Sequence, residues 1–134
     1  MTYCPISAAK IHELVSALYA ERWASSMSKI EQLGAVSEAR KICEFLTSSD
    51  GWRERVVAAK IIAAFDFADL VTPLISTFSG REESNTVRAF ARLITTTAMP
   101  NDRHKLFEEL RVCCPNTSYG RHMVTVIDDA SDAA

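Results

Sequence analysis

Apolar side chains recur along the whole chain every three or four residues, the spacing of one face of an α-helix. The first segment shows this clearly, with Ile11, Leu14, Val15, Leu18 and Tyr19 on one predicted helix face. Four glycines and four prolines leave few interruptions, and no segment alternates apolar and polar residues as a half-buried strand does. The pattern therefore predicts an all-α protein without strands.

The N-terminal part is expected to contain one long helix and one short helix. Pro5 fits the first turn of the long helix, which should end near Trp23 with that tryptophan in the core. Ser25 and Ser26 are then expected to break this helix. Ser28 with Glu31 forms a capping box for a short helix that Gly34 can end.

From residue 36 onward, a group of features recurs every 33 residues. Each copy has an arginine, an isoleucine six positions after it, and an acid or amide five positions before it. The arginines are Arg55, Arg88 and Arg121, and the preceding residues are Asp50, Glu83 and Asn116. A period of this length predicts stacked helical hairpins, here at 36–67, 68–99 and 100–130. Residues 1–35 are expected to cap them, so that 1–134 forms a single helical-repeat domain.

The same pattern predicts helices within these hairpins. They are expected near 37–47, from Trp52 to Phe65, from Val87 to Thr96 and near Gly120–Asp129. The outer helix of the second hairpin is expected to include Phe78.

The second hairpin carries a family resemblance. It has Pro73 in its first helix, an acid in its turn, and Val87-Arg88 followed by Ala91 in its second helix. In these features the chain resembles HEAT-like (armadillo/HEAT-type) helical repeat proteins. The resemblance implies a short right-handed α-α superhelix of about three hairpins with an N-terminal capping helix.

The resemblance also implies a ladder of polar pairs along the stack. In this ladder Asp50, Glu83 and Asn116 would bind Arg55, Arg88 and Arg121, and would fasten one hairpin to the next. The acid-to-arginine step is slightly shorter than is usual in the family, the first and third hairpins lack the proline, and Asn116 is an amide. Armadillo-type and other helical-hairpin repeats therefore stay open.

Composition and charge exclude several classes of protein. Of 134 residues, 48% are apolar and 24% are charged, which is typical of a globular domain. The net charge of −2 provides no general attraction to nucleic acid or acidic membranes. No segment reads as a membrane span. The cysteines form no C-x-x-C pair, so we expect reduced core thiols in a cytoplasmic protein; they are Cys4, Cys43, Cys113 and Cys114.

Candidate binding residues lie out of phase with the repeated arginines. Second helices of such hairpins tend to line one concave face, where Arg53, Lys60 and Arg92, with His122 as a fourth member, would form a weak basic strip. Trp52 begins the second helix of the first hairpin, and an exposed tryptophan can anchor a partner. A solvated helix face, and a tryptophan that covers the gap between two helices, are the structural alternatives.

Catalytic, cofactor and metal sites are not expected. Cys113 and Cys114 with His104 or His122 are the only pairing of a nucleophile with a base, and no third group marks them as a site. Histidines and cysteines lack the helical ligand spacing that metals use, and no phosphate-binding glycine loop is present. We therefore expect a protein that is not an enzyme.

These observations favour a non-enzymatic protein-binding module, such as an inhibitor or immunity protein that neutralises a partner toxin or enzyme. Two alternatives stay open. Some DNA glycosylases have HEAT-like folds, so nucleic-acid binding is one, although the acidic balance makes it a poor fit. A self-associating structural adaptor is the other. The chain would act as a monomer or a homodimer.

Overall fold

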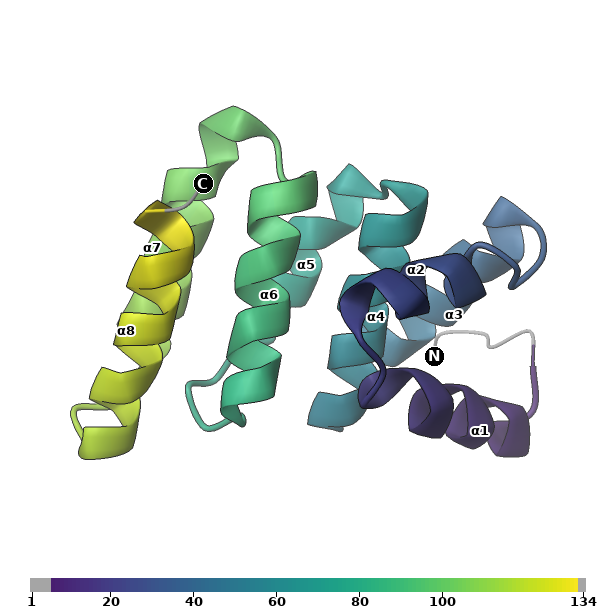
Figure 1. Ribbon diagram of the computed structural model, residues 1–134, viewed down its shortest axis with the longest axis horizontal. Helices are drawn as coiled ribbons and strands as arrows, with labels where there is room; N and C mark the ends of the chain where they lie inside the picture. Colours follow the sequence, from purple (N-terminus) through teal and green to yellow (C-terminus); the bar gives the residue numbers. More distant parts are fainter. Residues whose placement is uncertain (1–5, 133–134) are drawn as a thin grey trace.

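The computed structural model describes residues 6–132 and, over that range, contains α-helices and short 3₁₀ helices but no strand (Figure 1). The eight α-helices are α1 (Ala8–Tyr19), α2 (Trp23–Ile30), α3 (Val36–Thr47), α4 (Trp52–Phe65), α5 (Val71–Ile75), α6 (Ser84–Thr97), α7 (Arg103–Cys113) and α8 (Ser118–Asp132). The 3₁₀ helices η1 (Ala68–Leu70) and η2 (Pro100–Asp102) precede α5 and α7. The prediction of an all-α protein is confirmed for this range.

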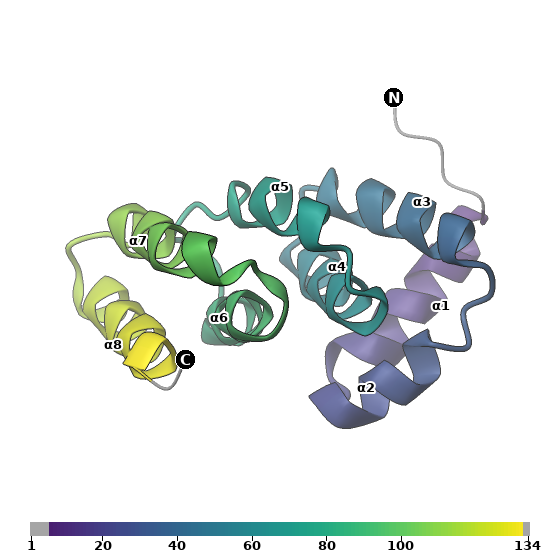
Figure 2. The same cartoon turned by 90° about the horizontal axis from the view of Figure 1, so that it is seen from above.

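From residue 36 onward, the helices lie in two rows. Helices α3, α5 and α7 form one row, and α4, α6 and α8 form the other (Figure 2). Along the second row α4 packs against α6 and α6 packs against α8, while α1 and α2 both pack against α4. The N-terminal helices therefore lie at one end of the array.

Helix α4 contains the longest run of consecutive buried residues in the described range. Its seven consecutive residues from Val56 to Ile62 are all buried, which is almost two full turns. A helix that is buried on every side needs neighbours on every side, and α4 has them in α1, α2, α3, α5 and α6. One member of this buried run, Lys60, is charged.

The Lys60 ammonium group binds the end of α1. Its Nζ atom donates hydrogen bonds to the carbonyl oxygens of Leu18 at 2.6 Å and Glu21 at 2.9 Å, and to the Ser26 hydroxyl at 3.0 Å. The last carbonyls of a helix have no partner within it and carry partial negative charge. The Leu18 carbonyl also accepts from the Glu21 backbone N–H at 3.3 Å, and Lys60 adds a charged donor to it from a helix about forty residues away in sequence.

The predicted N-terminal helices are wrong in their boundaries. Helix α1 ends at Tyr19, and α2 begins at Trp23 and runs through the serine pair that was expected to break a helix. Ser28 lies inside α2 rather than at its start. Lys60 donates hydrogen bonds to residues on both sides of this break, and no local capping motif reveals a contact with so distant a residue. Pro5 lies outside the described residues, and α1 is capped instead by Ser7, whose hydroxyl accepts from the backbone N–H of Lys10 at 3.3 Å.

The hairpin helices agree better with the prediction. Helix α4 has the predicted bounds, and α3 begins one residue early and ends as predicted. Helices α6 and α8 extend the predicted segments by one to three residues at each end. The outer helix of the second hairpin is shorter than expected, because α5 ends at Ile75 and Phe78 follows it. Phe78 is still a core residue, with its ring 6.1 Å from that of Phe90.

Replacing Lys60 with methionine is expected to destabilise the protein. The variant keeps the side-chain length but removes the donor that the Leu18 carbonyl, the Glu21 carbonyl and the Ser26 hydroxyl share, at a cost of about 2–3 kcal/mol in the free energy of unfolding. Urea denaturation measures it. Lys105→Met, on an exposed side chain of α7, is the matched control and should change little. Equal stability of both variants would contradict the role assigned to Lys60.

Burial also sets the chemistry of Cys43 in α3. Its side chain is fully buried, its thiol donates to the Ala58 carbonyl at 3.6 Å, and burial raises its pKa from 9.0 to about 12. The folded protein therefore keeps a proton that the unfolded chain loses above pH 9. The contribution of this thiol to stability is complete below pH 9 and is lost as the pH rises towards 12.

This difference predicts a pH dependence that Cys43→Ala removes. From pH 8 to pH 10, the wild type should lose about 1.4 kcal/mol of unfolding free energy relative to the variant. Urea denaturation of both proteins at the two pH values measures the change. If the unfolding free energies of the two proteins change equally with pH, Cys43 is not the source of the pH dependence.

Candidate functional site

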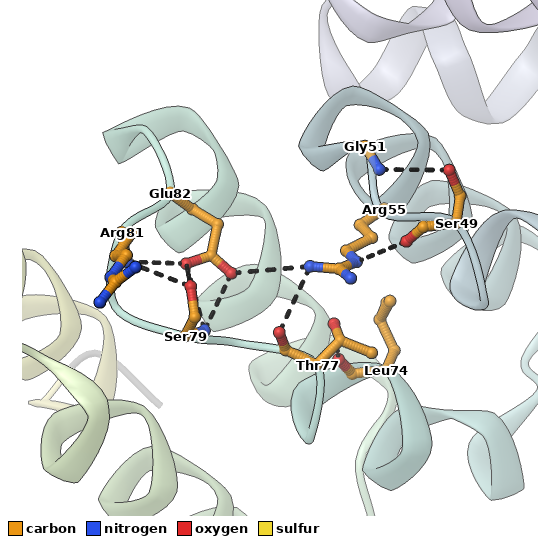
Figure 3. A network of polar contacts seen from close by, with 8 residues as sticks. All are labelled: Ser49, Gly51, Arg55, Leu74, Thr77, Ser79, Arg81 and Glu82. Carbon is orange, nitrogen blue, oxygen red and sulfur yellow. Dashed lines mark hydrogen bonds and ion pairs between the residues drawn. The ribbon is translucent and has the colours of Figure 1, made fainter.

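Arg55 joins the first hairpin to the second (Figure 3). Its Nε–H donates to the Ser49 carbonyl at 3.0 Å, in the turn before α4. Its Nη1 donates to the Thr77 carbonyl at 3.3 Å and lies 3.9 Å from a carboxylate oxygen of Glu82. Arg55 therefore connects the turn of one hairpin with the turn of the next.

Glu82 organises the turn that receives Arg55. Its carboxylate is buried and accepts hydrogen bonds from the Ser79 backbone N–H and hydroxyl and from the Arg81 backbone N–H (Figure 3). Its carbonyl accepts from the Tyr119 hydroxyl at 2.7 Å, which attaches α8 to the same turn. Gly80 in this turn has φ +85°, and an added Cβ would lie 1.9 Å from the Cys113 carbonyl. The turn therefore needs glycine at this position.

The contacts of Arg88, Arg121 and Glu83 differ from those of the expected ladder. Arg88 donates to Ser84 in its own helix at 3.3 Å. Arg121 binds Asn116 at 3.4 Å and Ser118 at 3.4 Å, within its own hairpin. Glu83, the acid assigned to the ladder, accepts instead from the hydroxyl of Tyr19 at 3.4 Å.

The acid that pairs with Arg55 is therefore Glu82, and Asp50 is exposed in the turn before α4. The position 33 residues after Glu82 is Pro115, which has no side-chain acceptor. Arg88 thus lacks the counterpart that holds Arg55. The expectation that all three arginines fasten neighbouring hairpins is corrected to one arginine, Arg55.

Trp52 and Arg53 lie against α1. The rings of Trp52 and Tyr19 meet edge to face, with centroids 5.1 Å apart. The Arg53 guanidinium carbon is 5.0 Å from the Trp52 ring centroid and 5.6 Å from that of Tyr19. Trp52 is half-buried and Arg53 is exposed, so this cluster is accessible from outside.

Arg92 forms a second cluster of this kind. Its guanidinium carbon is 5.0 Å from the ring centroid of Trp23, which begins α2. Trp23 is half-buried, so its expected place in the core is corrected. Arg88 lies one helical turn before Arg92 on α6, and both arginines are exposed. We define the arginine–aromatic surface as Tyr19, Trp23, Trp52, Arg53, Arg88 and Arg92.

Lys60 does not belong to this surface. Its side chain is 3% exposed, and burial lowers its pKa while nearby Glu21 opposes the shift. The expectation that Lys60 is an exposed binding cation is therefore corrected: its position on α4 turns it towards α1 and α2. Sequence reasoning missed Trp23, Tyr19 and Arg88, although the four-residue spacing of Arg88 and Arg92 placed them on one helix face.

Two hollows flank the exposed arginines of α6. A groove of about 460 Å³ lies between α6 and α8, and a smaller hollow of about 240 Å³ lies between α6 and the end of α1. Arg88 and Arg92 line both of them. The two arginines therefore form a ridge with a hollow on either side.

The cysteines and histidines do not assemble into a reactive site in the described part of the chain. Cys113 is exposed rather than packed in the core, and Cys114 donates to the Leu110 carbonyl at 3.3 Å. Burial raises the pKa of Cys114, the opposite of what a nucleophilic thiolate needs. Between residues 6 and 132, neither cysteine bonds to His104 or His122. Cys4 lies outside the described residues.

Metal-binding and membrane-spanning features are likewise missing from the described range. Over 6–132, there is no group of three histidine, cysteine or acidic side chains arranged to hold a metal ion. None of the helices in that range has both the length and the apolar character needed to span a bilayer.

Alanine substitutions at Arg55 and Arg88 distinguish an arginine that joins two hairpins from an arginine that stays on the surface. Arg55→Ala should lower the free energy of unfolding by about 1–3 kcal/mol, because buried Glu82 and the Thr77 carbonyl lose a charged donor. Arg88→Ala, on an exposed side chain, should change it by less than about 0.5 kcal/mol. Urea denaturation compares them. A larger loss of unfolding free energy for Arg88→Ala than for Arg55→Ala would contradict this assignment and would support the expected ladder.

Comparison with known proteins gave no match. No protein-family model, no curated protein and no solved structure matches the chain. The residues of the arginine–aromatic surface and their geometry are therefore the basis for assigning a function.

Proposed function

We propose that this protein is a non-enzymatic binding module that holds one protein partner on its arginine–aromatic surface. The observation that carries the proposal is the pairing of exposed arginines with half-buried aromatic rings, Arg53 with Trp52 and Arg92 with Trp23. Tryptophan, tyrosine and arginine are the residues that dominate the energetics of protein interfaces. Here four elements, α1, α2, α4 and α6, bring them together.

The contacts that hold this surface together support the same function. Ring contacts hold the arginines before any partner arrives, so less side-chain entropy is lost on binding. Lys60 fixes α1 and α2 against α4, and thereby fixes Tyr19 and Trp23 relative to Trp52. A preorganised surface of this kind suits an inhibitor or immunity protein that neutralises a toxin or enzyme in the same cell.

A HEAT-like superhelix is the architecture we propose for the array. Two rows of helices support it, as do Arg55, Arg88 and Arg121, which occupy the fourth or fifth position of α4, α6 and α8. The short α5 and the single inter-hairpin arginine depart from a regular repeat. Concave faces of such arrays commonly serve as binding surfaces.

The competing functions have less support. Lys60 is buried, so the basic strip loses one of its members, and a net charge of −2 does not attract nucleic acid in general. Self-association would use apolar surface, and the large apolar side chains exposed in the described residues lie at separate places: Val36, Met99, Val112 and Tyr119.

Charge reversal on the surface should abolish partner binding. With the tagged protein as bait in its native host, wild type should recover a stoichiometric protein partner and Arg53→Glu/Arg92→Glu should not, because two central interface cations are inverted. Mass spectrometry identifies the partner. Each single reversal should weaken Kd by about tenfold or more in calorimetry.

A matched control reverses exposed charges elsewhere. Arg81→Glu/Lys105→Glu reverses exposed charges at residues that do not belong to the arginine–aromatic surface and should keep the partner. If no stoichiometric partner is recovered by any form, or if the protein shifts duplex DNA in a gel at low salt, the proposed function is wrong. Light scattering on the purified protein distinguishes a homodimer from a monomer.

A further inference from the structure

Arg88 and Arg92 are positive charges that form no ion pair in the described structure. They stand four residues apart on α6, where like charges repel. The ion pairs between residues 6 and 132 join other side chains, while these two arginines contact the Ser84 hydroxyl and the Trp23 ring. A carboxylate placed over this turn of α6 would relieve the repulsion and could accept two parallel hydrogen bonds from one guanidinium.

The groove beside this pair is suited to apolar groups. Its wall on α6 includes Ala91, and its wall on α8 includes Val126 and Ala130. The threonine hydroxyls at its edge are already used, since Thr95 donates to the Ala91 carbonyl at 3.0 Å and Thr96 donates to that of Arg92 at 2.9 Å. The groove therefore offers apolar contact and has few polar groups that need a hydrogen-bond partner from a ligand.

The charges on the two walls differ in sign. Arg88 and Arg92 line the α6 side, and Asp129 lines the α8 side. A ligand that carries carboxylates along one edge only is attracted to the α6 wall and repelled from the α8 wall. The groove therefore selects both the composition and the orientation of what it binds.

We propose that this groove binds an acidic amphipathic segment of a protein partner. Its apolar side chains enter between α6 and α8, and its aspartate or glutamate side chains bind Arg88 and Arg92. This inference rests on the proposed function and adds to it the chemistry of the partner. Nucleic acid fits the groove less well, because Asp129 repels phosphate from the opposite wall and the apolar walls offer it nothing.

Selection from a displayed library of random 16-residue peptides tests the proposal and requires no purified partner. The full chain serves as the target, and Arg88→Gln/Arg92→Gln serves as the parallel target. Both arginines are exposed, so the variant should keep the wild-type circular dichroism spectrum and Tm. Arg81→Gln/Lys105→Gln removes the same charge from other exposed positions and is the control.

Peptides enriched on the wild type should combine acidic residues with apolar residues three or four positions apart. Their Kd should weaken about tenfold or more on Arg88→Gln/Arg92→Gln and should stay within about twofold on the control. Asp129→Asn should leave their affinity equal or tighter. Amide chemical shifts on binding should move at Ala91, Val126 and Ala130.

Several results would overturn the inference: no enrichment, peptides without an acidic bias, equal binding to the double glutamine variant, or shifts confined to other faces. Binding of duplex DNA that the same variant loses would overturn it in favour of a phosphate ligand. The bait experiment shows whether such a result refutes only the acidic-segment site or also the proposed function. A partner that both the wild type and Arg88→Gln/Arg92→Gln recover would refute the acidic-segment site alone.

Discussion

The buried ammonium group of Lys60 is the constraint on which the arrangement of the N-terminal helices depends. A buried charge is costly unless its hydrogen-bonding capacity is used, and here the carbonyls that end α1 and the Ser26 hydroxyl use it. These acceptors form one site only when α1 ends at Tyr19 and α2 turns back beside α4. The same contact therefore joins the break between α1 and α2 to α4, beside the buried apolar residues through which the three helices pack.

The arginine–aromatic surface is a consequence of that packing. Because α1 and α2 are held on α4, Tyr19 lies against Trp52, and Trp23 lies under Arg92. Lys60 itself is removed from the surface in the process. One basic residue of the chain thus stabilises the scaffold, while Arg53 and Arg92 remain exposed on it.

The repeated arginines divide in the same way between structure and exposure. Arg55 meets buried Glu82 and the Thr77 carbonyl, and it joins two hairpins. Arg88 stands at the equivalent position of the next hairpin, but Pro115 occupies the position that corresponds to Glu82. The Arg88 side chain therefore stays on the surface. A period in sequence does not ensure a period in contacts, because each contact needs both partners.

The sequence by itself determined α3, α4, α6 and α8 to within three residues at each end, including both ends of α4, because apolar periodicity and turn residues are local signals. It also placed Trp52, Arg53 and Arg92 among the candidate binding residues. Only the tertiary structure decided that Lys60 is buried, that Trp23 and Arg88 join the surface, and that Glu82 rather than Glu83 receives Arg55. These features depend on contacts between residues more than twenty positions apart, and side-chain direction across such distances is set by packing rather than by local sequence.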